Sequence, residues 1–545
     1  MASSPEDIPK PPRDRGALAR SSTDPIILRN TLRYTISAKE YQTLHKYIIS
    51  RSKVLKRNAP TVPQVEKLVA RPGGEDYNAA AVRASLRVFF ASSAALKAYA
   101  IVSERLFGRE RIRGKKIPLW RSPNLRLSIS LSTILLLHRI LFRFFTRLRS
   151  HLLTPDAKPF RQRNKRTSST LTSDLAPAIG ASLAGFALAV VPKDQLRVTI
   201  GIYSLSRALE FAYNYAEDEG LIWGREGRPW WWGSWMIMPL ASGQLLHAFV
   251  FDRDCFPKAY GDFILKNSPQ YLQGRPTDYP SNLPWPSTYQ VVDSLAQMAK
   301  LHYPPFISPI LIPNSSTLPP SLTAISPITS PAHPLITSLS CAALHPTDPS
   351  CLRTYLTYWI RVFPRLTRFV AVLFAVLSVP AYKRFYRFPI ASLDALARRI
   401  LSYSAFMAGS IGSSWGAICL FQQILPRTVL STQRFFLGGM IGGLWGFMIK
   451  SNGRGAFLYS ARASVDSLWK VGKKRGWWKG VKGGDVWLFV FSLMIVNVVY
   501  ERDARGIRSV GLRKSISSLR GEGWRDWVQE EDERLLAEEE REKEL

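Results

Sequence analysis

Long apolar segments alternate with charged segments over most of this chain. Five apolar segments lie in the first half, at about residues 80–101, 127–145, 175–192, 196–215 and 230–251. Five more follow in the second half, at about 355–380, 399–426, 435–449, 456–470 and 486–500. The segment at 230–251 carries no charged residue, and about 20 such residues cross the hydrocarbon core of a bilayer as a helix. The pattern predicts an all-α, polytopic membrane bundle with about 8–10 apolar helices.

The fourth and ninth apolar segments each contain a pair of opposite charges. Arg207 and Glu210 are three residues apart, and Arg462 and Asp466 are four apart, so each pair shares one face of a helix. Charged side chains are costly in an apolar helix unless they face a cavity, a partner or the membrane surface. We therefore predict either ion pairs that line a cavity or two helices that lie flat on the membrane.

The two halves of the chain resemble each other. Five short matches occur in the same order at similar spacing: Leu86-Arg87-Val88-Phe89 with Ile360-Arg361-Val362-Phe363, Arg126-Leu127 with Arg399-Ile400, Ile202-Tyr203-Ser204 with Leu458-Tyr459-Ser460, Arg228-Pro229-Trp230-Trp231 with Arg475-Gly476-Trp477-Trp478, and Phe251-Asp252-Arg253-Asp254 with Tyr500-Glu501-Arg502-Asp503. Their colinear order predicts an internal duplication and two similar lobes. Five spans in each lobe would give inverted repeats, whereas flat fourth and ninth segments would give parallel ones.

These patterns divide the chain into five regions. They are a polar, basic N-terminal region at 1–79, a first membrane lobe at 80–260, a loop and Pro/Ser/Thr-rich linker at 261–350, a second membrane lobe at 351–503, and a charged tail at 504–545. Near the start, Ser37 and Glu40 have capping-box spacing, which predicts a helix that rests on a membrane or packs on its own domain. The acidic end of the tail predicts a solvated helix or a disordered end.

The chain carries a formal net charge of +34. Basic clusters at 109–116 and 161–166 lie between apolar segments, where they would meet anionic lipid headgroups. The sequence has no zinc-finger spacing, no aromatic RNA-binding signature and no basic-region heptads. The charge therefore predicts membrane lipids as partners and argues against nucleic acid.

Small residues recur at helical spacing in two apolar segments. Gly438, Gly442 and Gly446 repeat every four residues in the eighth segment, and Ala181 with Gly185 repeats the spacing more weakly in the third. Glycines at this spacing let another backbone approach closely, so they predict tight helix packing. A glycine face that lines a pore is the functional alternative.

Few residues of the chain are candidates for a disulfide, a metal site or catalysis. The chain has four cysteines, too few for a disulfide framework, although Cys341 and Cys351 could form one bridge. Cys341, His345 and Cys351 are close in sequence, but their spacing fits no common zinc module, so we predict a structural role and neither metal nor cofactor. His247 and Asp252 have the spacing of the acid-base pair of glycerolipid acyltransferases, without a second acyltransferase block. No catalytic residue is therefore predicted.

Two blocks of residues resemble a known family. They are Cys341-Ala342-Ala343-Leu344-His345-Pro346 closing in Pro349-Ser350-Cys351, and the region 247–260. With these blocks the chain resembles the transmembrane protein 135 family, in its fungal branch, over about residues 80–503. The second lobe more distantly resembles the mitochondrial preprotein and amino acid transporter superfamily, through Gly438-x-x-x-Gly442 and Arg462-x-x-x-Asp466, but it lacks the glycine pair expected after the acid.

The resemblance implies a multi-pass protein of peroxisomal or mitochondrial membranes, linked with organelle dynamics and lipid homeostasis. Together with the residues above, it predicts a non-enzymatic membrane protein that takes part in lipid or metabolite transport or in organelle dynamics. The first alternative is a translocase-like channel or scaffold subunit with protein partners or a second copy of itself. The second alternative is a membrane-bound acyltransferase.

Overall fold

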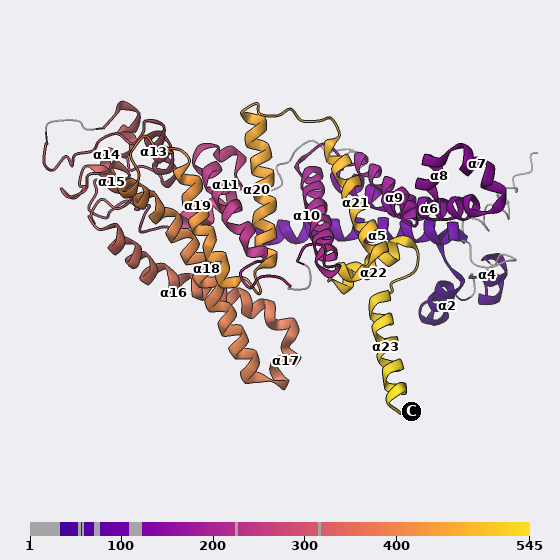
Figure 1. Ribbon diagram of the computed structural model, residues 1–545. Coiled ribbons are helices and arrows are strands. Elements are labelled where there is room, and N and C mark those ends of the chain that lie inside the picture. The colour runs from indigo at the N-terminus through magenta and orange to yellow at the C-terminus, as the bar shows by residue number, and fades with distance from the viewer. Residues whose placement is uncertain are drawn as a thin grey trace, which may run out of the picture. The chain divides into compact units, whose positions relative to one another are not determined.

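The described part of the chain is helical. The computed structural model describes residues 33–52, 56, 59–69, 77–107, 122–223, 227–313 and 318–544. Residues 1–32 and the basic cluster at 109–116 lie outside these ranges. Within them, helices are joined by loops, and the one β-type pairing is an isolated bridge between Pro305 and Ser338 (Figure 1). The all-α prediction is confirmed for these residues.

Five described helices are long and apolar enough to cross a membrane. They are Tyr77–Ser103, Pro123–Leu153, Ser234–Phe251, Pro389–Ile424 and Gly484–Arg502. A sixth span is obtained if Lys165–Thr172 and Ala176–Val190, bent by 86°, count as one. These helices support the predicted multi-pass membrane protein. The other predicted segments are also helical, but Arg434–Ile449 is shorter, and the helices at 195–218, 351–378 and 454–474 carry more charge.

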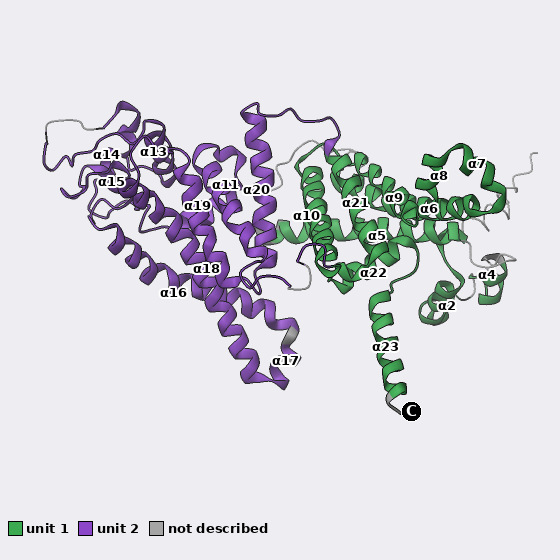
Figure 2. Ribbon diagram, in the orientation of Figure 1, with its two compact units in different colours: residues 1–219, 485–545 green, residues 220–484 purple. Residues whose placement is uncertain are grey.

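The chain divides into two compact units (Figure 2). Unit 1 comprises residues 1–219 and 485–545, and unit 2 comprises residues 220–484. Each unit differs from the corresponding predicted lobe in its last membrane helix. Helix α11 (Ile237–Phe251), expected at the end of the first lobe, belongs to unit 2, and α21 (Gly484–Arg502), expected at the end of the second, belongs to unit 1.

Unit 1 is built around a long helical hairpin. Helix α5 (Tyr77–Phe107) packs on α6 (Pro123–Leu153), and α6 contacts α9 (Ala176–Ala181) and its 3-10 continuation η4 (Ser182–Val190). Helices α10 (Gln195–Asp218), α21 and α22 (Val510–Arg520) complete the unit, with a buried cluster that includes Phe211, Val499 and Ile516. The acidic α23 (Trp527–Glu544) is mostly exposed, which corresponds to the solvated-helix alternative.

Unit 2 repeats several of these features. Helix α16 (Cys351–Ser378) packs on α18 (Pro389–Ile424), and α18 packs on α19 (Arg434–Leu444) and its 3-10 continuation η10 (Trp445–Ile449). Helix α11 packs on α19 and on α20 (Arg454–Lys474). Tyr271, Trp415 and Phe435 are among the largest fully buried side chains of this unit.

The Pro/Ser/Thr-rich stretch predicted as a linker is packed into unit 2. It contains the short helices η8 (Pro320–Ile325) and α14 (Ser326–Thr329), which lie against α13 (Thr288–Lys300) and α15 (Leu339–Leu344). Leu322 and Ile325 have no exposed surface. The prolines keep the backbone irregular as predicted, but the apolar residues between them are buried in the core, so this stretch is not a linker.

The glycines of α19 lie where backbones approach closely. A Cβ atom at Gly442 would lie 2.6 Å from the carbonyl oxygen of Ser410 in α18, and one at Gly439 would lie 2.8 Å from the Cα of Gly243 in α11. Gly438 faces Ala417 of α18 at 3.3 Å, and Gly446 faces Met238 at 3.2 Å. In unit 1, a Cβ at Gly185 would lie 3.0 Å from Val490 of α21. The small residues thus set helix separation in both units.

The predicted N-terminal helix is present as α2 (Ala38–Tyr47). Its capping box is formed, because the Ser37 N–H donates to Glu40 Oε2 at 3.0 Å and the Glu40 N–H donates to Ser37 Oγ at 3.3 Å. Tyr41 is buried against Val65 of α4 (Val62–Val69). The helix therefore packs its apolar face on a neighbouring helix.

Candidate functional site

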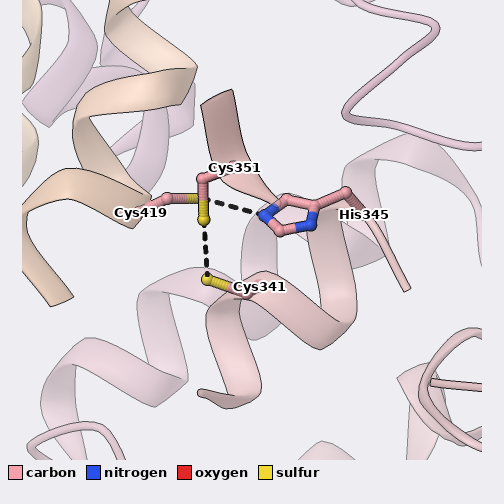
Figure 3. Close-up of side chains that lie close together, drawn as sticks. All are labelled: Cys341, His345, Cys351 and Cys419. Atoms are coloured by element: carbon pink, nitrogen blue, oxygen red, sulfur yellow. Dashed lines mark hydrogen bonds between the residues drawn. The ribbon is translucent and has the colours of Figure 1, made fainter. Parts of the chain in front are cut away.

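Unit 2 brings three cysteines and one histidine together (Figure 3). Cys341 lies in α15, His345 follows the end of that helix, Cys351 begins α16, and Cys419 lies near the end of α18. The Sγ atoms of Cys341 and Cys351 are 3.8 Å apart, and Cys419 Sγ lies 3.4 Å from His345 Nε2. All four ligand atoms lie within 4.8 Å of one another. Cys341, His345 and Cys419 are buried, and Cys351 is half-buried.

The loop between His345 and Cys351 fixes the imidazole ring. His345 Nδ1 lies 2.7 Å from the carbonyl oxygen of Asp348. A carbonyl oxygen only accepts, so Nδ1 carries a proton, and Nε2 is the ring nitrogen that faces the sulfur atoms. The Asp348 carboxylate accepts from the Ser350 N–H at 2.9 Å and from Arg353 at 2.7 Å, which holds the loop in place.

Charges in the cluster favour a thiolate at Cys351. Hydrogen bonds with Cys341 and Cys419 and the neighbouring His345 lower the pKa of the Cys351 thiol well below its usual range. Cys351 is also the first residue of α16, where backbone N–H groups favour negative charge. Burial lowers the pKa of His345, but its hydrogen bonds with Cys341 and Cys351 outweigh burial and raise it to about 10.

The sequence identified three of these residues and missed the fourth. Cys341, His345 and Cys351 come from one short motif, but Cys419 follows on a different helix and has no fixed spacing to them. The only signal was that the chain has just four cysteines. The bridge considered between Cys341 and Cys351 is not formed, since both are free thiols.

Unit 2 also contains a cavity of about 230 Å³. Helices α11, α12 (Lys258–Lys266), α18 and α20 contribute its walls, which are mainly apolar and include Leu246, Phe263 and Met407. Trp415, one helical turn before Cys419, also lines it. Six of the lining residues carry hydroxyl groups, which could hydrogen-bond with a ligand: Ser242, Tyr260, Ser410, Ser414, Tyr459 and Ser460. The Ser242 Oγ is buried without a hydrogen-bond partner among the described residues.

The residues of the predicted ion pairs are not among those that line this cavity. Arg207 Nη1 donates to Glu210 Oε2 at 2.8 Å within unit 1. In unit 2, Asp466 accepts from Lys470 at 2.7 Å, whereas the residues of α20 that line the cavity are Ala456, Tyr459 and Ser460. A role for Arg207, Glu210, Arg462 and Asp466 in lining a passage therefore stays a prediction.

His247 and Asp252 do not form an acid-base pair in the described structure. The Asp252 carboxylate accepts from Arg475 at 2.5 Å and pairs with Lys474 at 3.5 Å. The His247 ring instead packs on Phe251, with ring centroids 4.8 Å apart. Because its carboxylate is held by two cations, Asp252 is not arranged to orient the imidazole as the acyltransferase hypothesis requires.

Comparison with protein-family models, with curated proteins and with solved structures finds no match for this chain. The resemblance to the transmembrane protein 135 family stays a prediction from the residues quoted above.

Proposed function

We propose that this chain is a non-enzymatic, multi-pass membrane protein that binds a neutral lipid in the cavity of unit 2. The observation that carries the proposal is the apolar cavity between α11 and α18, two helices long and apolar enough to cross a membrane. Concave, mainly apolar sites with a few convergent polar groups are typical of small-molecule binding. A site between membrane-crossing helices is reached directly by lipids.

The lining of the cavity favours a particular kind of lipid. Among the described residues, no charged side chain lines it, so a charged headgroup would find no counter-ion there. Apolar contact alone gives little preference over the surrounding lipid tails, because both environments are equally apolar. Hydroxyl-bearing lining residues, among them Tyr459 and Ser460, would supply the preference, since they can hydrogen-bond with a lipid hydroxyl or ester carbonyl.

A photo-crosslinking experiment tests this proposal. Purified full-length protein in mild detergent is labelled with diazirine analogues of a sterol and of diacylglycerol, and the labelled peptides are identified by mass spectrometry. We expect labels on α11, α18 and α20, and a loss of labelling in Ser460→Phe, which fills the cavity. Ser451→Phe, an exposed position outside the lining, is the matched control. Labelling that is equal in both variants would contradict lipid binding at this site.

The proposed cellular setting follows from the family resemblance. It is a peroxisomal or mitochondrial membrane, with a role in lipid or metabolite transport or in organelle dynamics. Organelle fractionation with alkaline carbonate extraction tests this placement, because an integral membrane protein stays with the pelleted membranes. The translocase-like or scaffold alternative would instead be favoured by stable partner subunits that co-purify in mild detergent.

We also propose that the two units are copies of one five-helix repeat whose last helices are exchanged. The order α5, α6, α9 with η4, and α10 in unit 1 corresponds to α16, α18, α19 with η10, and α20 in unit 2. In both units the third helix continues as a 3-10 helix. In both units a glycine of this third element faces the fifth helix: Gly185 faces α21, and Gly439 faces α11.

A further inference from the structure

We propose that Cys341, His345, Cys351 and Cys419 bind a single Zn²⁺ ion. Zinc in proteins is tetrahedral, with sulfur ligands at about 2.3 Å and nitrogen ligands at about 2.0–2.1 Å. Such a tetrahedron places two sulfur ligands about 3.8 Å apart and a sulfur and a nitrogen about 3.5 Å apart. The distances here are 3.8 Å between Cys341 and Cys351 and 3.4 Å between Cys419 and His345.

The surroundings of the four residues are those of a metal ligand set. His345 presents Nε2 while its Nδ1–H donates to a backbone carbonyl, the arrangement that orients most metal-binding histidines. Gln423, one turn beyond Cys419 on α18, donates to Cys351 Sγ at 3.6 Å, as expected around a thiolate ligand. Two of the three cysteines and the histidine are buried, so the ligands are shielded from competing water.

A disulfide, a different metal ion or an iron–sulfur cluster would fit these four residues less well. A disulfide needs sulfur atoms about 2.05 Å apart, so the Cys341–Cys351 separation is that of two ligands rather than of a bond. Three thiolates and one imidazole select zinc among common metal ions, whereas calcium and magnesium prefer oxygen. The four ligand atoms lie within 4.8 Å, which fits one central ion better than a cluster of several iron atoms. Because four protein ligands fill the tetrahedron, the site is structural and not catalytic.

The site joins parts of unit 2 that are far apart in sequence. It would connect α15 and the packed Pro/Ser/Thr-rich region to the start of α16 and to the end of α18. Trp415, one turn before Cys419, lines the lipid cavity, so the ion would also hold one wall of that cavity. The spacing Cys-x3-His-x5-Cys with a distant fourth ligand also explains why the motif matched no common zinc module.

Metal analysis of the purified full-length protein tests the proposal. We expect about one Zn²⁺ per chain by inductively coupled plasma mass spectrometry, and at least a tenfold loss in Cys419→Ser and in His345→Ala. Cys255→Ser is the matched control, because Cys255 is a buried cysteine of unit 2 outside the cluster and its zinc content should be unchanged. Folded protein without zinc, or full zinc retention in Cys419→Ser, would overturn the proposal.

A ligand exchange keeps the test decisive if loss of a cysteine prevents folding. Cys351→His replaces one zinc ligand by another at a half-buried position, so it should retain zinc, whereas Cys351→Ser should lose it. Substitution of Co²⁺ in the wild-type chain should give thiolate charge-transfer absorption and the visible bands of a tetrahedral ion. Equal zinc content in the serine and histidine variants, or an oxidised Cys341–Cys351 pair under non-reducing mass spectrometry, would contradict the site.

Discussion

The two units use comparable helices but stabilise them differently. In unit 1 a buried asparagine joins three elements: Asn497 of α21 donates to Ser182 Oγ of η4 at 2.9 Å and lies 3.1 Å from His138 Nε2 of α6. In unit 2 the matching position of α11, by the alignment of 251–254 with 500–503, is Ala248, which is buried among apolar groups. Among the described residues, the cysteine and histidine cluster occurs in unit 2.

The difference indicates a division of roles. A buried polar network is costly unless every member is paired, and such networks specify one arrangement of helices. Unit 2 contains a cavity instead, and a cavity removes packing contacts from its walls. We infer that the proposed zinc site would compensate for the missing packing, so that unit 2 could hold the proposed lipid and still keep its shape.

Removal of the metal should have the largest effect, and only on unit 2. With strong chelator, or in Cys419→Ser, we expect faster proteolysis within residues 268–350, because the proposed ion would tie Cys341 and His345 of this region to α18. Unit 1 should stay resistant, which limited proteolysis with peptide mapping would measure. Equal loss of protection in both units would contradict the separation of roles.

A buried ion pair in unit 1 should have the next largest effect. Arg513 and Asp526 are joined by two hydrogen bonds of 2.8 Å, and both side chains are almost fully buried. Asp526→Ala leaves the Arg513 guanidinium without its carboxylate partner, with only the Ile507 carbonyl still accepting from it, so we expect a loss of about 3–5 kcal/mol in the free energy of unfolding. Chemical denaturation of the purified protein would measure it, with Glu530→Ala, whose side chain is more exposed, as the comparison.

The same pair gives a pH dependence. The hydrogen bond from Arg513 lowers the pKa of Asp526 in the folded state. The stabilisation is therefore fully present above the unfolded-state pKa of about 3.9 and is lost as pH falls through the lower folded-state value. Asp526→Asn should remove this part of the acid sensitivity, and an unchanged acid-unfolding profile would show that another group controls it.

Reciprocal substitutions at the matched positions sharpen the comparison. Ala248→Asn would bury an amide among apolar neighbours in unit 2, and Asn497→Ala would leave Ser182 without the amide that donates to it in unit 1. Each should cost about 1–3 kcal/mol in the free energy of unfolding, as expected for unsatisfied buried polar groups. Thermal unfolding followed by circular dichroism would measure both. A neutral Ala248→Asn would mean that unit 2 has a hidden polar partner at this position.

The smallest effect is expected at two half-buried ion pairs, each within a single helix. Glu210→Gln and Asp466→Asn each remove one member of a pair within a single helix, so we expect about 0.2–0.5 kcal/mol of destabilisation. Lipid labelling at the unit 2 cavity should be unchanged. If either substitution abolishes labelling while stability is retained, these residues line a passage after all.

Much of the secondary structure could be predicted from the sequence. Hydrophobic length located the helices, and the spacing of Ser37 and Glu40 located the capping box at the start of α2. Both signals are local, because a helix and its cap depend on residues within a few positions of each other. The partner of each helix could not be predicted, since α11 and α21 are apolar on most sides and no face identifies the neighbour.

For the same reason, only part of the candidate site could be predicted from the sequence. Cys341, His345 and Cys351 lie within one loop and its flanking helices, so their proximity followed from sequence. Cys419 reaches them only because α18 packs on α15 and α16, which is a tertiary contact. The Ser242 hydroxyl likewise became notable only when its burial without a partner was seen.

X-ray absorption spectroscopy at the zinc edge tests the metal site most directly. In purified full-length protein we expect about three sulfur ligands at roughly 2.3 Å and one nitrogen at roughly 2.0 Å. In Cys419→Ser the sulfur count should fall or the zinc should be lost. A zinc ion coordinated only by oxygen and nitrogen, or a wild-type spectrum unchanged in Cys419→Ser, would contradict the site.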